Sequence, residues 1–599
     1  MSKQNEVRYD RRTVRDWVRK ALAGEVAITD FQRSFVWRSD KAANYLKAII
    51  EGKPVGLYLI LEMASPPQFA PRSFNRMDTS LDGVSELVLD GQQRLTSLLH
   101  ALSRRSEKRF FIQLSNILSD RLQFEDIVYE GVHTAKGRQY ENPATCYLHN
   151  RVPMDVLLDE TDDRGLTPLA RWCIDVGDQS IGVSESRVLE SKVIKFINEN
   201  FFERPIWFCW LPASIDRTSA TEIFVETNTS SVRIKRFDIE VANARGRHDE
   251  DLRNSIQDAY NMPSNGALRH YFKEDPEDWI PDIGEWMLKV ACLRAGYAPR
   301  ERNYQYAIEF LFGQQDDDRF PEVEKMFEYL AWALDQVAER GAATRRTVPS
   351  WPPLHVLAAL RPQLNLLQDP ARINTARRLH EAYYWRCLFS DRYDVQANDR
   401  LYEDFLALSD ALEQVRTQGT WNVDQPAFDD RDHPLYNSDE LLRHSGWIGT
   451  SSRLGRALAT VVMSQQPVDW ITGDLLNPNK VRELERDGDL DRHHVFSRDA
   501  LKKADEPVER IQNGLNGVFL DGKTNRRLAK APPDIYLRKV VQTSQISADE
   551  LRSRIEQHFV PYDEMKDEGP IRDRYANFLT KRAKDFARRI KGLGQIPKR

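Results

Sequence analysis

The stretch DRHHVFSRDALKKADEPVERIQNGLNGVFLDGKTN, from Asp491 to Asn525, decides how the C-terminal part of this chain is expected to fold. Its HHVF segment is β-prone, and LNGVFLDGKTN predicts a second short strand and a turn. RRLAKAPPDIYLRKVV follows and is expected to become helical after its two prolines. The doublet His493-His494 comes after an acidic residue, and Asn516 lies nine positions before Asn525. The stretch therefore predicts two strands and a helix that carry imidazole and amide groups.

These residue types suit phosphodiester hydrolysis. The reaction needs a base that takes a proton from water and a cation that stabilises the developing charge. A neutral imidazole is available because the unperturbed pKa of histidine is about 6.5. A histidine pair alone is more often structural, but the asparagine spacing and the nearby basic side chains favour a site. The basic residues able to meet DNA phosphates are Lys523, Arg526, Arg527 and Lys530.

Length and composition indicate several soluble domains. The chain has 599 residues, 41% of them hydrophobic and 30% charged, which predicts two to four domains. It contains no run of eighteen apolar residues, and its N-terminus lacks the apolar core of a signal peptide. Its five cysteines are scattered, with no C-x-x-C pair. We therefore expect a cytoplasmic protein in a reducing compartment, without a membrane partner.

Charge distribution says more than the net charge of −5. Residues 572–599 hold ten Lys or Arg and two acids, with apolar residues near helical spacing. This pattern predicts an amphipathic terminal helix with a basic outer face. This helix could simply dock on the protein core, or its basic face could contact DNA phosphates, and the sequence favours neither interpretation.

The N-terminal part contains a second strand–turn–helix, SELVLDGQQRLTSLLHAL. Residues 86–89 are expected to form a buried strand, Asp90 and Gly91 a tight turn, and residues 92–102 a helix with four leucines on one face. A helix N-terminus attracts phosphate, Arg94 could add a bidentate contact, and Asp90 could hold a divalent ion or orient water. The alternative without a binding function is an ordinary turn in which Arg94 pairs with a nearby acidic residue.

Other N-terminal elements follow from local pattern. Helices are expected over residues 10–23 and from Asp40, as its cap, to about residue 51, with strands over residues 57–62 and 201–212.

Three phrases in this part resemble the prokaryotic DGQQR domain family. They are FQRSFVW from Phe31, VLDGQQRLTSL from Val88, and IFVETNTSSVRIKRFDIEVANA from Ile223. The resemblance implies a fold related to ParB and sulfiredoxin that binds and hydrolyses a nucleoside triphosphate, ATP or GTP. On that resemblance the pocket would be lined by Gln32, Arg33, Asp90, Gly91, Gln92, Gln93, Arg94 and Asn228.

The C-terminal stretch resembles HNH nucleases, which have a ββα-metal fold. The resemblance implies that His494 is the general base and that His493 and Asn525 hold Mg²⁺ or Mn²⁺, with Asn516 bridging backbone groups. The roles of the two histidines could also be exchanged.

The middle of the chain is expected to be helical. Residues 323–337 place apolar side chains on one face, as in the core of a helix bundle. Residues 383–408 combine aromatics with arginines, and such a combination can bind nucleic acid. Tyr383, Tyr384 and Trp385 are consecutive and cannot all face one way, so internal packing is favoured over this contact. The predicted class is a multidomain α+β protein with an α/β domain at 1–250, a helical region at 251–470, and a ββα-metal domain within a mainly helical surround at 471–599.

A DGQQR domain joined to an HNH domain resembles the GmrSD-type, modification-dependent (type IV) restriction endonucleases. This implies a nucleotide-regulated, metal-dependent DNA endonuclease of antiphage defence that cuts or nicks modified phage DNA, for example with hydroxymethylated or glucosylated cytosine. Cutting both strands with single HNH sites favours a homodimer. Two alternatives stay open: a phosphorothioate-sensing nicking nuclease of the same architecture, and a nucleotide-dependent DNA-binding switch with a non-catalytic HNH remnant.

Overall fold

The computed structural model describes residues 8–75, 77–119, 121–158, 161, 165–229, 236–272, 276–313, 323–421, 426–448, 452–528, 530–566 and 569–595. The chain divides into two compact units, Met1–Leu252 and Arg253–Arg599. Both helices and strands are present, so the α+β class is confirmed. The expected division near residue 470 lies inside the second unit. No described helix is long and apolar enough to cross a membrane.

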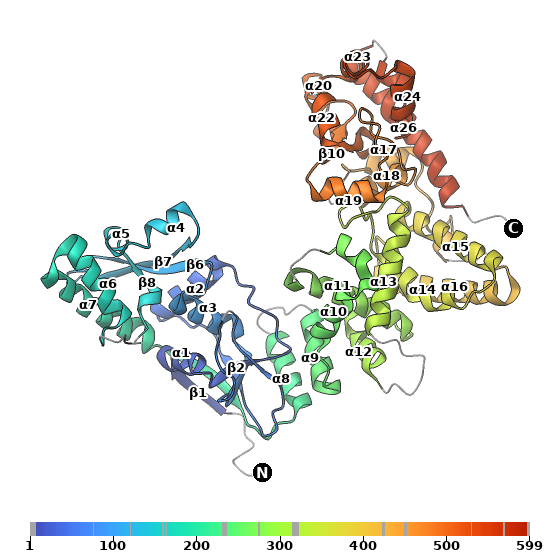
Figure 1. Ribbon diagram of the computed structural model, residues 1–599. Helices are drawn as coiled ribbons and strands as arrows, with labels where there is room; N and C mark the ends of the chain where they lie inside the picture. Colours follow the sequence, from blue (N-terminus) through green and yellow to red (C-terminus); the bar gives the residue numbers. More distant parts are fainter. Residues whose placement is uncertain are drawn as a thin grey trace. The chain divides into compact units, whose positions relative to one another are not determined.

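The first unit is built on a six-stranded sheet of mixed direction (Figure 1). Neighbouring strands pair parallel at β9–β3 and β5–β2 and antiparallel elsewhere. In spatial order the strands are β1 (Arg8–Thr13), β9 (Pro205–Leu211), β3 (Tyr58–Glu62), β5 (Glu86–Asp90), β2 (Val26–Thr29) and β4 (Pro71–Arg72). The strand expected at residues 201–212 joins this sheet as β9 but begins only at Pro205, because Phe201 and Phe202 end a helical segment.

Helices and a smaller sheet complete the unit and share its apolar core. The three-stranded sheet runs β7 (Gln123–Gly131), β6 (Lys108–Ser115), β8 (Arg151–Pro153). The helices are α1 (Val14–Leu22), α2 (Ser39–Ile50), α3 (Gln92–Ser103), α4 (Ala135–Gln139), α5 (Pro143–Leu148), α6 (Pro168–Val176), α7 (Val183–Ile197), α8 (Arg217–Thr229) and α9 (Arg236–His248).

The strand–turn–helix prediction is confirmed, with corrections elsewhere. β5 leads through Gly91 into α3, whose four leucines are buried. The helix expected over residues 10–23 is wrong in its first part, because β1 occupies Arg8–Thr13 and pairs with β9, about two hundred residues later. The helix expected at Asp40 forms as α2, but Arg38 is its cap residue, without a side-chain bond.

Helices dominate the second unit, as expected. They are α10 (Leu252–Asn261), α11 (Pro276–Arg294), α12 (Tyr304–Phe312), α13 (Val323–Ala338), α14 (Pro352–Asn365), α15 (Pro370–Leu388), α16 (Ala397–Gln418), α17 (Ser438–His444), α18 (Arg453–Met463), α19 (Pro478–Arg486), α20 (Arg498–Lys503), α21 (Val508–Ile511), α22 (Gly522–Leu528), α23 (Pro533–Thr543), α24 (Ala548–Glu556), α25 (Tyr562–Lys566) and α26 (Ile571–Leu593). The apolar face of α13 is buried, which confirms it as bundle core.

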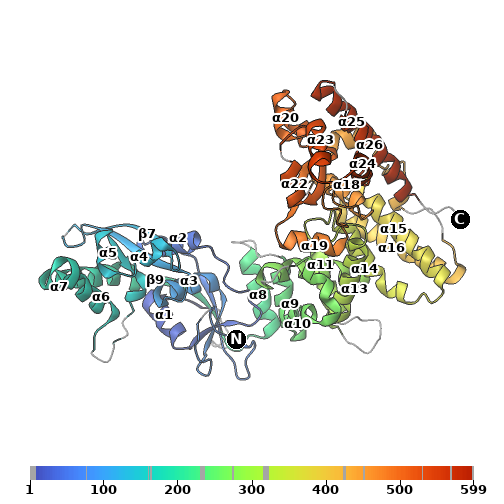
Figure 2. The same ribbon diagram turned by 45° about the horizontal axis from the view of Figure 1, so that its top comes forward.

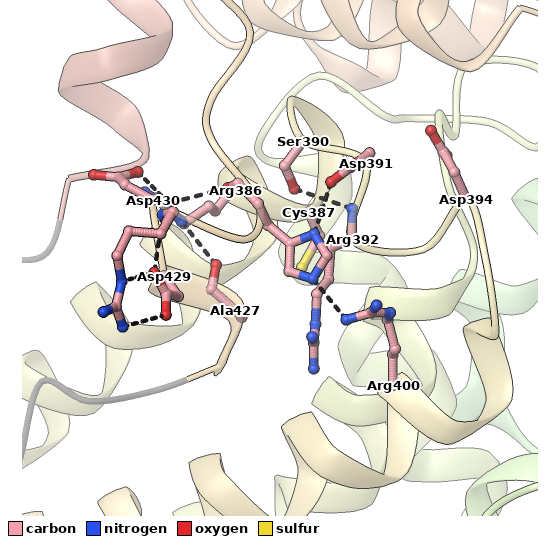
Figure 3. Close-up of polar contacts among 12 residues, drawn as sticks. Arg386, Cys387, Ser390, Asp391, Arg392, Asp394, Arg400, Ala427, Asp429 and Asp430 are labelled. Atoms are coloured by element: carbon pink, nitrogen blue, oxygen red, sulfur yellow. Dashed lines mark hydrogen bonds and ion pairs between the residues drawn. The ribbon is translucent and has the colours of Figure 1, made fainter.

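The aromatic and arginine-rich segment at 383–408 packs internally. The Arg386 guanidinium donates to the Ala427 carbonyl at 2.7 Å and pairs with Asp430 (Figure 3). Arg400 donates to Nε2 of His433 at 2.6 Å. These arginines therefore already bind partners within the chain, which supports internal packing over contact with nucleic acid.

The C-terminal part centres on a two-stranded antiparallel ribbon, β10 (Leu490–His494) with β11 (Gly517–Asp521). Helix α22 follows β11 directly, and α23, α24 and α26 lie in the same red part of the unit (Figure 2). The predicted terminal helix forms as α26, but Arg574 and Arg582 are buried in it, so its basic face is smaller than expected.

Candidate functional sites

A cavity of about 790 Å³ opens in the first unit at the N-terminus of α3. Its wall includes Gly91 and the first turn of α3, and α3 begins without a side-chain cap. The backbone N–H groups of a first helical turn lack intrahelical partners and carry partial positive charge. The cavity brings together seven of the eight residues predicted to bind nucleotide: Gln32, Arg33, Asp90, Gly91, Gln92, Gln93 and Arg94. The side chain of the eighth, Asn228, lies outside the described residues, at the end of α8.

Arg94 is held rigidly at one side of this cavity. Its guanidinium donates to Asp90 Oδ2 at 2.7 Å and to the Leu57 carbonyl at 2.9 Å. It also lies over the ring of Tyr58, 5.1 Å from the centroid. Gly91 has φ 108°, and a Cβ there would come within 2.6 Å of the Tyr58 ring. Glycine is thus required where the strand turns into the helix.

Three glutamines, two from VLDGQQR and one from FQRSFVW, fix the loop after β2 that lines the cavity. Gln92 donates to the Arg33 carbonyl at 2.6 Å, and Gln93 donates to the Ser34 carbonyl at 3.0 Å. Gln32 donates to the Val88 carbonyl at 2.9 Å. The side chains that sequence reasoning assigned to ligand binding therefore also build the cavity wall.

The second site lies on one face of the β10–β11 ribbon. His493 Nδ1 is 2.8 Å from Asn525 Oδ1, and Asn525 Nδ2 donates to Asp491 Oδ2 at 3.0 Å. Since alternate strand residues share a face, Asp491 and His493 both point toward α22, which carries Asn525. Burial lowers the pKa of His493 to about 4, and the bond to Asn525 opposes this shift. His493 is therefore neutral at pH 7 and can act as a ligand.

His494 points to the other face of the strand. Its ring stacks on Trp447 with centroids 3.8 Å apart. Burial lowers the pKa of His494 to about 4 too, against the effect of a hydrogen bond with Gln512. The residue His494 is partly exposed and His493 is almost fully buried, but the Nε2 atoms of both rings are buried and have no hydrogen-bond partner among the described atoms. The structure therefore brings His493 and Asn525 together and holds His494 separately.

Asn516 is fully buried and bridges backbone groups. Its Oδ1 accepts from the Phe496 N–H at 2.8 Å, and its Nδ2 donates to the carbonyls of Phe496 at 3.0 Å and Ile511 at 3.3 Å. Arg582 of α26 supports the same region, donating to the Gly517 carbonyl at 3.1 Å. These contacts fix the chain just after the histidine doublet and at the start of β11.

The donor set suits a hard divalent cation. Ligands of Mg²⁺ lie at about 2.0–2.1 Å in an octahedron, so neighbouring ligand atoms are about 3 Å apart. The 2.8 Å between His493 Nδ1 and Asn525 Oδ1 is close to that spacing. Asp491 adds a carboxylate oxygen beside them. The four residues predicted to bind DNA, Lys523, Arg526, Arg527 and Lys530, are all exposed on or just after α22.

Comparison with known proteins addresses the first unit directly. Residues 14–244 match the family model described as GmrSD restriction endonuclease, N-terminal domain. This match supports a relationship to GmrSD-like restriction endonucleases. It spans five strands of the six-stranded sheet, all but β1 (Arg8–Thr13), and all the described residues that line the α3 cavity. The second unit lies beyond the GmrSD match.

A similar chain extends over both units. An uncharacterized protein of Methanocaldococcus jannaschii is 21% identical over 581 residues, which cover 93% of this chain and 92% of that protein. The similarity to this archaeal protein therefore extends over both units.

Sequence reasoning missed Asp491 and Trp447 as parts of the second site. Asp491 was visible as the acid two positions before His493, because strand alternation puts such residues on one face. Nothing in the sequence placed Trp447 against His494, since 46 residues separate them and no local pattern links them.

Proposed function

We propose that this protein is a nucleotide-regulated, metal-dependent DNA endonuclease of antiphage defence that cuts or nicks modified foreign DNA. The observation that carries the nuclease part is the Asp491–Asn525–His493 chain beside an exposed basic helix. The GmrSD match of residues 14–244 supports restriction as the context and DNA as the substrate. Hydroxymethylated or glucosylated cytosine is the expected modification.

In the first unit, the α3 cavity would bind a nucleoside triphosphate. Phosphate would lie against the first-turn N–H groups of α3, where the helix dipole favours negative charge. Asp90 keeps the Arg94 guanidinium at the cavity wall with little freedom to lose on binding. Hydrolysis of ATP or GTP here would regulate the nuclease.

In the second unit, His493 and Asn525 would hold Mg²⁺ or Mn²⁺, with Asp491 beside them. Such a cation stabilises negative charge on the scissile phosphate and the leaving oxygen. His494 would take the proton from the attacking water, because burial keeps its imidazole neutral at pH 7 and its ring stacks on Trp447. Lys523, Arg526 and Arg527 would bind DNA phosphates on either side of the cut. Cutting both strands would require two copies, as in a homodimer.

The test is plasmid cleavage by the full chain with His494→Ala, beside His444→Ala as control. His444 is an exposed histidine of α17 in the same unit, so the control removes an imidazole away from the site. Plain and hydroxymethylated or glucosylated plasmids are compared with Mg²⁺, with EDTA, and with and without nucleotide. We expect His494→Ala to lose at least a hundredfold in rate, within the usual contribution of a general base, and His444→Ala to keep the parent rate.

Equal rates for the parent and His494→Ala would overturn the assignment of the base. Cleavage confined to phosphorothioate DNA would favour the phosphorothioate-sensing nuclease. Binding without cleavage on every substrate would favour the DNA-binding switch, for which the deep burial of His493 is the specific supporting observation.

A further inference from the structure

A cavity of about 360 Å³ lies among α13, α14 and α15 of the second unit, apart from the nuclease residues. Ligand pockets of about 300–1,000 Å³ hold small organic molecules, so this volume suits one compact ligand. Its polar lining residues are Gln336, Arg340, Arg361, Asn365, Arg377 and His380.

The lining is strongly cationic. It contains three arginines and no carboxylate among its described residues. The nearest acids lie outside the lining: Glu381, 3.5 Å from Arg340, and Glu339, 4.0 Å from Arg377. Both acids are substantially exposed, so solvent screens their charge. The cavity therefore has positive charge that its own wall does not neutralise.

Two polar atoms of the lining are buried and make no hydrogen bond among the described atoms: Nε2 of His380, and Nε of Arg340, which lies 3.5 Å from Oε1 of the half-exposed Glu381. Their side chains are 7% and 5% exposed. Burial, followed by the charges of Arg340 and Arg361, lowers the pKa of His380 to about 3, and burial also lowers the pKa of Arg340. A buried polar group without a hydrogen-bond partner is destabilising. An anionic ligand with hydrogen-bonding groups would give His380 a partner and would give Arg340 a closer one than Glu381.

One side of the cavity is apolar and aromatic. Leu357, Leu364 and Leu367 line it, and the Arg361 guanidinium lies over the Trp332 ring, 4.6 Å from the centroid. Arginine planes and aromatic rings are surfaces on which nucleobases stack. The amides of Gln336 and Asn365 can hydrogen-bond the edge of such a base. A ligand with one phosphate and one planar polar ring fits this combination better than a simple anion.

We propose that this cavity binds one nucleoside monophosphate unit. Its phosphate contacts Arg340 and Arg377, and its base lies against Trp332 and Arg361. The unit comes either from free nucleotide or from a nucleotide turned out of a DNA duplex, which presents the same phosphate and base. The inference goes beyond the proposed nuclease, because binding here requires neither cleavage nor a metal.

The first arm of the test is equilibrium dialysis of the full chain with radiolabelled dCMP, with sites counted per chain. Arg361→Gln and Trp332→Leu are compared with Arg378→Gln, an exposed arginine on α15 that does not line the cavity. Counting sites separates this cavity from any binding at α3. We expect both cavity variants to lose one site or to weaken it at least tenfold, and Arg378→Gln to match the parent. Deoxycytidine, which lacks phosphate, should bind at least tenfold more weakly than dCMP.

The second arm measures affinity for a duplex with one extrahelical cytidine and for its fully paired counterpart. If the unit comes from DNA, Arg361→Gln weakens the first duplex at least tenfold and the second less than threefold, relative to Arg378→Gln. Thermal melting checks that each variant folds. If Arg361→Gln does not fold, the comparison of Trp332→Leu with Arg378→Gln decides the test. The proposal is overturned if the cavity variants match Arg378→Gln in both arms, or if deoxycytidine binds as tightly as dCMP. Because both arms measure binding, failure of nuclease activity leaves their outcome unaffected.

Discussion

Asn516 offers the sharpest test of how the histidine-bearing strand is held. In Asn516→Ala, the Phe496 N–H and the carbonyls of Phe496 and Ile511 all lose a partner. The side chain is fully buried, so bulk water does not replace these bonds. The substitution therefore leaves three backbone groups without a partner in the segment that connects β10 to β11.

The magnitude follows from that count. Each buried group left unsatisfied costs about 1–3 kcal/mol. The lower half of the summed range applies, because the space of a deleted amide can admit a water that pairs with one of the three groups. We therefore expect Asn516→Ala to lower the local unfolding free energy of the ribbon by about 3–6 kcal/mol. Cleavage should fall in parallel, because the loop after His494 is no longer fixed.

Hydrogen–deuterium exchange of peptides covering residues 490–521 measures this local free energy directly. Asn437→Ala is the matched control, because Asn437 caps α17 through an exposed capping box in the same unit. It should cost about 1 kcal/mol near α17 and leave exchange in the ribbon unchanged. A loss below about 1 kcal/mol in Asn516→Ala would refute the bridging role.

Three further outcomes are expected. Burial lowers the pKa of both His493 and His558 to about 4, so the folded state excludes protons that the unfolded chain binds. The free energy of unfolding that this exclusion contributes is complete above pH 6.5 and falls by about 1.4 kcal/mol per pH unit for each histidine as the pH drops toward 4. Urea unfolding from pH 7.5 to 5 measures the fall, and an unfolding free energy that does not change with pH contradicts the prediction. Gly91→Ala should lower the melting temperature more than Gly165→Ala, because both have positive φ but only Gly91 meets a neighbouring ring; equal shifts would exclude the clash. Arg94→Lys should reduce nucleotide hydrolysis at least tenfold, since lysine cannot keep the bonds to a carboxylate and two carbonyls; unchanged turnover removes Arg94 from the site.

The sequence was sufficient where local periodicity decides structure. The turn at Gly91 and the leucine face of α3 were predicted because residues close together in the sequence determine both features. The strand β1 was not, because RYDRRT has no strand pattern of its own and becomes a strand only through pairing with β9. Contacts between residues far apart in sequence made the difference.

The candidate sites divide in the same way. The residues of the α3 cavity come from short motifs and were predicted together. The grouping of Asp491 with Asn525 needed the fold of the ribbon on α22. The cavity lined by Arg340 and Arg361 joins α13, which was predicted only as bundle core, to α14 and α15. A helix core and a helix-lined pocket have the same apolar spacing, so periodicity does not distinguish them.

Charge determines how the ribbon site would hold its cation. His493 is neutral and Asn525 is an amide, so Asp491 brings the only formal negative charge among the three residues. Hard cations bind in proportion to the charge of their oxygen ligands, and one carboxylate with two neutral donors makes a weak site by itself. A DNA phosphate brought in by the exposed lysine and arginines of α22 supplies the missing charge. Cation and DNA are therefore expected to bind with positive coupling, so that the complete catalytic centre forms only on the substrate.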